Sequence, residues 1–183
     1  MSETNLQRRL WYTDYLDRVT VDQDFLRTDS RSLVVLGEPG MGKTTLLQRL
    51  RDVDGFTVCT ARRLIINPNP QSLLGAATTL VIDALDEVSA QHEGDAVDLV
   101  LERLVKLDTP RFILSCRVAD WRSATALQGI ADFYDPAPIE LHLEPLDRSD
   151  AVTFLDATLG NPHKSLATLT RSDGSSIPEA SKF

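Results

Sequence analysis

The octapeptide Gly37-Glu38-Pro39-Gly40-Met41-Gly42-Lys43-Thr44 constrains the fold of this chain more than any other segment. It fits G-x-x-x-x-G-K-[ST], the phosphate-binding P-loop, at every fixed position. An apolar run at residues 33–36 precedes it and is typical of a buried strand, whereas residues 45–50 have a helical pattern. Strand, glycine-rich loop and helix follow one another in the order that phosphate binding requires.

Each part of this loop has a chemical role in binding phosphate. Glycines let the backbone approach a phosphate closely, while the loop N–H groups and the following helix dipole attract its negative charge. We expect Lys43 to reach the β- and γ-phosphates, the Thr44 hydroxyl to bind Mg²⁺, and Thr45 to add a phosphate hydrogen bond. The candidate nucleotide-binding residues are Gly37, Glu38, Pro39, Gly40, Met41, Gly42, Lys43, Thr44 and Thr45. The alternative is a glycine-rich turn before a surface helix.

A second motif, Leu80-Val81-Ile82-Asp83-Ala84-Leu85-Asp86-Glu87, is an apolar strand that ends in acidic residues, the Walker B pattern. We expect Asp83 to hold Mg²⁺, through a coordinated water, opposite Thr44. If the chain coils after the strand, Asp83 and Glu87 share a face at i, i+4, and Glu87 can orient and deprotonate an attacking water. Asp86 competes with Glu87 for this role. A solvated acidic turn is the alternative for the whole segment.

A third motif, Phe112-Ile113-Leu114-Ser115-Cys116-Arg117, is another apolar strand that ends in a polar pair and an arginine. The carboxyl ends of parallel strands line the ligand crevice of such a sheet. Arg117 is therefore predicted to reach the γ-phosphate, with a charge that it cannot lose. The alternative is a surface arginine at a strand end.

The pattern along the chain predicts an α/β fold, a three-layer P-loop sandwich with a mostly parallel five-stranded sheet. Apolar strands that alternate with helices favour a parallel sheet covered on both faces. Strands are expected near residues 33–36, 56–59, 79–82, 112–115 and 139–143, and helices near 44–51, 95–107, 119–128 and 148–159. Residues 6–26 are predicted to be helical, because Leu6, Leu10, Trp11, Tyr15, Leu16 and Val19 lie near a 3.6-residue spacing.

Three regions follow from this pattern. Residues 1–30 form the predicted N-terminal helical segment, and residues 31–160 form the nucleotide-binding core. Residues 161–183 are rich in Ser, Thr, Gly and Pro, which predicts a weakly ordered tail or the truncated start of a further helical region.

Composition limits the kinds of partner. The 183 residues carry a net charge of -8, with 27 acidic and 19 basic residues, and the pairs Arg8-Arg9 and Arg62-Arg63 are expected to be solvated surface. Nonspecific nucleic-acid binding rests on neutralising phosphates, so we do not expect a nucleic-acid partner. No apolar run approaches the length of a membrane span, and the first residues lack a signal-peptide pattern; a cytoplasmic location and no membrane partner are expected.

Together the three motifs resemble those of STAND-class P-loop NTPases, and of the NACHT group within it most closely. Asp83-Ala84-Leu85-Asp86-Glu87 is similar to the acidic motif of that group, with Ala84 where its members usually have glycine. Ser115-Cys116-Arg117 is similar to its sensor-1 arginine site. Ordinary AAA+ ATPases place the catalytic glutamate directly after the Walker B aspartate, and that position is Ala84 in this chain. The resemblance covers residues 33–159.

The resemblance implies a Mg²⁺-dependent ATPase that acts as a nucleotide-dependent signalling switch. ATP and Mg²⁺ are the implied cofactors, with hydrolysis expected to be slow. Members of this class also associate into signalling platforms, so the implied partner is another protein or a second copy bound through the NTPase core. The helical lid, effector and sensor regions of the class are not recognisable in this sequence.

Three alternatives remain open from the sequence. The chain could bind nucleotide and a partner without significant hydrolysis, because water exclusion supplies much of the rate in such sites. It could be a nucleic-acid ATPase related to loaders or helicases, against which the negative charge and Ala84 both count. It could also be a fragment of a larger STAND protein, with no function by itself.

Overall fold

The computed structural model describes residues 7–85, 88, 96–123, 129–147 and 150. The chain divides into two compact units, of which Gln7–Pro145 contains the sheet and the helices that pack on it. Residues 1–6 and 146–183 form the other unit. The predicted helix at residues 148–159 and the predicted tail at 161–183 lie outside the described residues, apart from Asp150.

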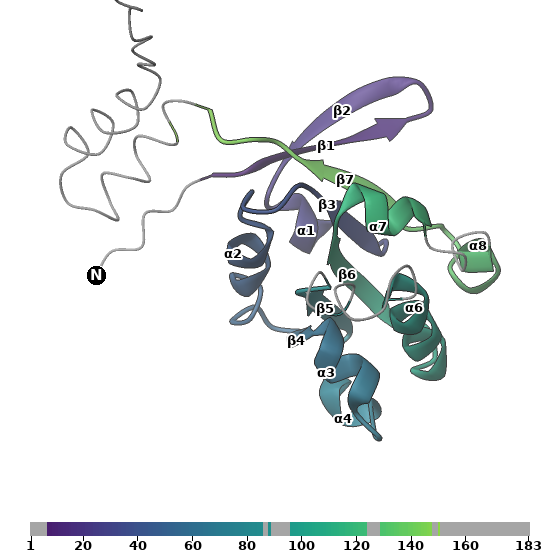
Figure 1. Ribbon diagram of the computed structural model, residues 1–183. Coiled ribbons are helices and arrows are strands. Elements are labelled where there is room, and N and C mark those ends of the chain that lie inside the picture. The colour runs from purple at the N-terminus through teal and green to yellow at the C-terminus, as the bar shows by residue number, and fades with distance from the viewer. Residues whose placement is uncertain (1–6, 86–87, 89–95, 124–128, 148–149, 151–183) are drawn as a thin grey trace, which may run out of the picture. The chain divides into compact units, whose positions relative to one another are not determined.

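A seven-stranded sheet forms the centre of the Gln7–Pro145 unit, in the order β2-β1-β7-β3-β6-β5-β4 (Figure 1). Its strands are β1 (Arg9–Asp14), β2 (Asp17–Asp22), β3 (Leu33–Leu36), β4 (Phe56–Thr60), β5 (Thr79–Asp83), β6 (Arg111–Cys116) and β7 (Ile139–Leu143). The five strands from β7 to β4 are parallel, and they match the five predicted strands. The predicted α/β class and mostly parallel sheet are confirmed, but the sheet has two more strands than the five predicted.

Both faces of the three central strands, β3, β6 and β5, are buried, apart from the first residue of β6, as their continuous apolar sequences require. In β3, Val34 and Leu36 belong to one core cluster, and Leu33 and Val35 belong to a second. Because successive side chains of a strand point to opposite faces, the two clusters are the two sides of one sheet. The first cluster also holds the buried residues of helix α6, and the second holds Leu46 and Leu47 of helix α2.

The helices agree with most of the predicted segments. They are α1 (Phe25–Thr28), α2 (Lys43–Gln48), α3 (Ala61–Ile66), α4 (Gln71–Leu74), α6 (Ala96–Lys106), α7 (Val118–Ser123) and α8 (Ile130–Phe133). Helix α6 follows the amphipathic pattern, since it buries its apolar positions at Ala96, Val97, Val100, Leu101 and Leu104. In the described ranges, none of the helices is both long enough and apolar enough to cross a lipid bilayer.

The predicted helix at residues 6–26 is wrong. Strands β1 and β2 form an antiparallel hairpin, and β1 also pairs antiparallel with β7. In β1, Leu10 and Tyr12 face the core and alternate with residues that face outward, and Val21 faces the core from β2. Leu10 belongs to the second core cluster, and the partly buried Tyr12 and Val21 pack against it. The helical spacing depended on Tyr15 and Leu16, which are 96% and 97% exposed where the hairpin turns. The alternation of buried and exposed residues with a period of two, together with the edge of β7 that would otherwise be unpaired, therefore decides the structure of this segment.

The hairpin makes a prediction about stability that separates it from a helix. Leu10→Ala should lower the free energy of unfolding by about 2–5 kcal/mol, because Leu10 is fully buried between β2 and β7. Leu16→Ala should change it by less than about 0.5 kcal/mol, since the side chain contacts solvent. Urea denaturation of both variants measures the difference. Equal losses, or a larger loss for Leu16→Ala, would contradict the hairpin.

Candidate functional site

The carboxyl ends of three neighbouring strands bring the predicted motifs together. Strand β6 lies between β3 and β5, with Val35 opposite Ser115 and Ile82 opposite Leu114. The glycine-rich loop that follows β3 therefore meets Asp83, the last residue of β5, at one edge of the sheet. The pocket at this edge has a volume of about 350 Å³ and is lined by Pro39, Gly40, Gly42, Lys43, Thr44, Asp83, Ala84 and Ser115. This volume lies in the range of small-molecule sites.

The backbone of the loop takes conformations that favour glycine. Gly40 and Gly42 have φ angles of +79° and +85°, a region that residues with a Cβ enter only at a cost. Gly42 is the residue before α2, and its carbonyl accepts a hydrogen bond from the Leu46 N–H at 3.0 Å. At the other end of the loop, the Gly37 N–H donates to the Cys116 carbonyl of β6 at 3.3 Å. The loop is thus fixed to α2 and to the sheet.

Lys43 lies inside its own loop. Its side chain is buried, and Nζ donates to the Gly37 carbonyl at 2.6 Å and to the Glu38 carbonyl at 3.1 Å. Both carbonyls belong to the start of the loop, so the ammonium group crosses the loop rather than extending into solvent. Lys43 itself lines the pocket, so its positive charge lies where it can attract an anionic ligand.

Asp83 accepts hydrogen bonds from the hydroxyls of two other elements. Thr44 Oγ1 of α2 donates to Asp83 Oδ1 at 3.3 Å, and Ser115 Oγ of β6 donates to the same oxygen at 2.7 Å. Asp83 is only 3% exposed, so these donors matter, because a buried carboxylate without partners is costly. A carboxylate next to a Thr hydroxyl is also the oxygen-ligand pair that fits Mg²⁺, which keeps several waters and takes few protein ligands.

Ala84 turns the chain away from β5 with a φ of +58°. A non-glycine residue in this left-handed region costs about 1 kcal/mol or more. Ala84 also lines the pocket, directly after the carboxylate. Position 84 therefore combines a backbone angle that favours glycine with a place in the pocket lining.

The remaining predicted residues differ in what the structure says of them. Asp86 and Glu87, the two candidates for the catalytic base, lie outside the described residues. Arg117 follows β6 and is half-buried, and among the described residues it is not part of the pocket lining. Its role as a γ-phosphate sensor therefore stays a prediction. Thr45 and Glu38 are exposed and also lie outside that lining.

Two residues near the pocket were missed from the sequence. Ser115 lines the pocket, whereas the sequence analysis chose Arg117, two residues later in the same motif. A polar residue near the end of an apolar strand was the sequence signal that could have identified Ser115. Arg8 was expected on the solvated surface, and this is wrong. It is 7% exposed, and its guanidinium contacts the P-loop carbonyl of Met41 at 2.7 Å. Its sequence neighbourhood gave no sign of this contact.

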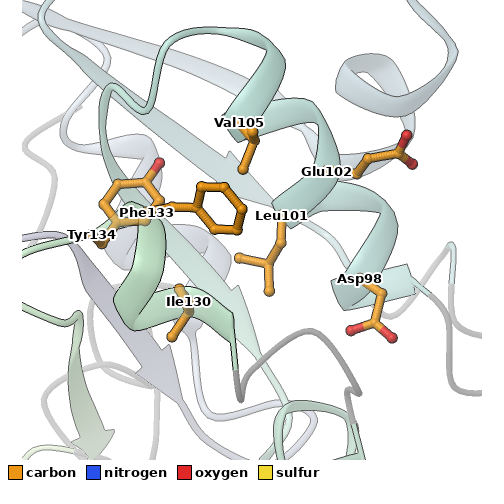
Figure 2. Close-up of a pocket in the computed structure, with 7 residues that line it drawn as sticks. All are labelled: Asp98, Leu101, Glu102, Val105, Ile130, Phe133 and Tyr134. Atoms are coloured by element: carbon orange, nitrogen blue, oxygen red, sulfur yellow. The ribbon is translucent and has the colours of Figure 1, made fainter.

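A second cavity lies between α6 and α8 and has different chemistry (Figure 2). It has a volume of about 250 Å³, and its apolar lining comes from Leu101, Val105, Ile130, Phe133 and Tyr134. Burial raises the pKa of the Tyr134 phenol above its usual range, and Tyr134 Oη donates to the Pro110 carbonyl at 3.1 Å. The other two lining residues, Asp98 and Glu102, are acidic and would repel a phosphate group. The convergent polar groups lie in the P-loop pocket.

Comparisons with known proteins identify no family for this chain. No protein-family model matches the sequence, and no curated protein matches it. Among solved structures, the chain is similar to a chain from a study of DNA unwinding at forked duplex DNA by two coordinating Pif1 helicases, with 17% sequence identity and a TM-score of 0.39. The match covers 85% of this chain and 51% of the other. Similarity at this level does not assign a family or an activity.

The shared hydrogen-bond acceptor makes a prediction that needs no ligand. Ser115→Ala should lower the free energy of unfolding by about 1–3 kcal/mol, because it removes the shorter of the two hydrogen bonds described to the buried carboxylate of Asp83. In a chain that already carries Asp83→Ala, the same change should cost much less, since the acceptor is gone. A double-mutant cycle by chemical denaturation without Mg²⁺ or nucleotide measures this coupling. Equal costs in both backgrounds would contradict it.

Proposed function

We propose that this chain binds MgATP at the P-loop pocket, hydrolyses it slowly and acts as a nucleotide-dependent regulatory switch. The observation that carries the proposal is the convergence of Thr44 and Ser115 on Asp83 Oδ1 beside a glycine-rich loop that holds Lys43. A phosphate-binding loop and a Mg²⁺-ligand pair at one strand edge are the parts that P-loop NTPases share.

Binding follows from the chemistry of the loop and its lysine. The loop backbone at Gly40 and Gly42 lines the pocket and presents no side chain to a phosphate chain. On nucleotide binding, Lys43 Nζ would exchange the Gly37 and Glu38 carbonyls for β- and γ-phosphate oxygens. Thr44 and Asp83 would hold Mg²⁺, directly and through water, and the ion supplies charge neutralisation for the β- and γ-oxygens when bound.

Hydrolysis needs an acceptor that is aimed at the attacking water. Glu87 is proposed for this role and Asp86 is its competitor, because both follow the Asp83 strand within four residues. Arg117 is proposed to sense the γ-phosphate. The preference for ATP, the switch function and a protein partner or self-association through the core rest on the resemblance to STAND NTPases of the NACHT group.

The second candidate function is a nucleotide-binding interaction module without significant hydrolysis. Two features favour it: the pocket residue Thr44 is exposed, and Ala84 stands where a catalytic glutamate follows the Walker B aspartate in AAA+ enzymes. An open, wet site forfeits much of the electrostatic stabilisation that accelerates hydrolysis. Single-turnover assays at saturating MgATP separate the two functions, since only the switch forms product within hours.

Lys43→Ala tests the binding site. The variant should weaken MgATP binding by roughly 10- to 100-fold or more, because a charge-assisted phosphate contact contributes about 1.5–3 kcal/mol. Lys106→Ala removes the same charge from the exposed end of α6, where Lys106 pairs with Glu102, and should leave affinity unchanged. Isothermal titration calorimetry compares the three proteins. Unchanged affinity in Lys43→Ala would exclude this pocket as the nucleotide site.

Glu87→Gln tests the hydrolytic base. It should retain MgATP binding and reduce turnover by roughly 100-fold or more, the usual contribution of a positioned general base. Asp86→Asn is the matched control, one residue away with the same loss of charge, and should reduce turnover far less. Phosphate release under single-turnover conditions is the measurement. Normal turnover in Glu87→Gln together with loss in Asp86→Asn would transfer the role to Asp86.

A further inference from the structure

Arg8 joins the P-loop to the end of strand β7 from a buried position. It precedes β1, and its side chain donates from Nη1 to the Met41 carbonyl and from Nη2 to the Glu144 carbonyl, each at 2.7 Å. Met41 belongs to the P-loop, and Glu144 is the residue after β7. Among the described residues, Arg8 is not part of the pocket lining. Its contact with the loop is therefore made outside the pocket.

The bond to Met41 fixes the direction of a loop N–H group. The Met41 carbonyl and the Gly42 N–H belong to one planar trans peptide, in which the two groups point in opposite directions. Because the carbonyl is directed at Arg8, the Gly42 N–H is directed away from it. Gly42 lines the pocket, so the arginine determines how this donor is presented to a phosphate.

Close packing at Gly42 supports the same role. A Cβ atom added to Gly42 would lie 2.9 Å from Arg8 Nη1, which is closer than a carbon and a nitrogen atom can approach without displacement. The guanidinium therefore lies directly against the loop backbone. The φ of +85° favours glycine at position 42, and any other residue there would displace the Arg8 guanidinium.

The other side of the arginine is firmly held. The Glu144 N–H donates to the Arg9 carbonyl at 3.0 Å, while its carboxylate pairs with Arg18 at 2.7 Å and with Arg9 at 3.3 Å. Arg9 and Arg18 come from β1 and β2, so Glu144 is bound to both strands of the hairpin. Because exposed ion pairs contribute little to stability, the backbone hydrogen bond between Glu144 and Arg9 is the main contact that fixes the carbonyl accepting from Arg8.

Gln23 links the backbone of Arg8 to helix α2. Its side-chain Oε1 accepts from the Arg8 N–H at 3.2 Å and from Arg49 Nη1 at 2.9 Å. Gln23 follows β2, and Arg49 is the residue after α2. The start of β1, the end of β2 and the helix that follows the P-loop are therefore connected around Arg8.

We propose that Arg8 is a positioning residue that holds the P-loop in its phosphate-binding conformation, so that nucleotide affinity depends on the N-terminal hairpin. The inference rests on the proposed nucleotide-binding function. Arg8 acts through the Met41–Gly42 peptide and does not touch the ligand. Because the loop amides cradle the α- and β-phosphates, ATP and ADP should both depend on Arg8 to a similar degree.

Arg8→Met and Arg9→Met form a matched pair of variants. The two residues are adjacent, and each substitution removes one positive charge and keeps an apolar side chain of similar length. They differ in contact, because the buried Arg8 donates to the P-loop, whereas the Arg9 side chain is mostly exposed and pairs with Glu144. Calorimetry with MgATP and with MgADP should show affinity reduced at least about tenfold for both nucleotides in Arg8→Met, equivalent to about 1.4 kcal/mol. Arg9→Met should remain within about threefold of wild type, and an equal effect of the two variants would overturn the proposal.

Arg8→Lys keeps the experiment decisive if Arg8→Met folds poorly. Lysine retains the charge but lacks the planar fork that reaches two carbonyls, so its affinity should fall between those of wild type and Arg8→Met. All affinities are measured well below the unfolding temperature of each variant. A lower unfolding temperature with unchanged affinity would show that Arg8 supports only the fold, and would overturn the proposal.

Amide hydrogen exchange in ligand-free protein separates failure of the inference from failure of the proposed function. The Met41 and Leu46 N–H groups donate to the Glu38 and Gly42 carbonyls, and their exchange should accelerate in Arg8→Met but not in Arg9→Met. If wild type binds no nucleotide, the proposed function fails, and this exchange still tests the positioning role. Equal exchange at these amides in all three proteins would overturn the inference.

Discussion

The buried carboxylate of Asp83 is the group on which the rest of the site depends. Its Oδ1 atom accepts hydrogen bonds from the hydroxyl groups of Ser115 in β6 and Thr44 in the first turn of α2. The ends of β5 and β6 and the start of α2, which are far apart in the sequence, must therefore meet within hydrogen-bond distance. The parallel arrangement, with β6 between β3 and β5, brings these strand ends together. The continuous apolar sequences of β3 and β5, buried on both faces, make that arrangement stable.

The N-terminal hairpin lies beside β7, at the edge of the parallel strands opposite β4 (Figure 1). Without the hairpin, β7 would present an unpaired edge. The backbone of Arg8, the residue before β1, would then not be fixed beside the P-loop. The hairpin is held by backbone pairing to β7 and by the charged pairs of Glu144 with Arg9 and Arg18. A segment far from the phosphate motif in sequence thus becomes a support of the phosphate loop.

The sequence predicted the parts of the molecule that are governed by local patterns. The P-loop, the five parallel strands and Asp83 follow from apolar runs, glycine spacing and one acidic strand end. The hairpin was missed because apolar residues at its exposed turn, Tyr15 and Leu16, imitated a helical spacing. Ser115 and Arg8 were missed because their importance arises from partners on other elements, Asp83 and the Met41 carbonyl. Contacts of that kind leave no periodic signal in the sequence.

The loop and Asp83 are together proposed to bind the phosphates and the metal of a nucleoside triphosphate. A crystal structure with Mg²⁺ and a non-hydrolysable ATP analogue tests this proposal most directly. We expect the phosphate chain to lie against the backbone of residues 37–44, with Mg²⁺ about 2.0–2.1 Å from Thr44 Oγ1 and the Asp83 carboxylate beside a water bound to the ion. Phosphates bound elsewhere in the molecule, with this loop in contact with solvent alone, would contradict it.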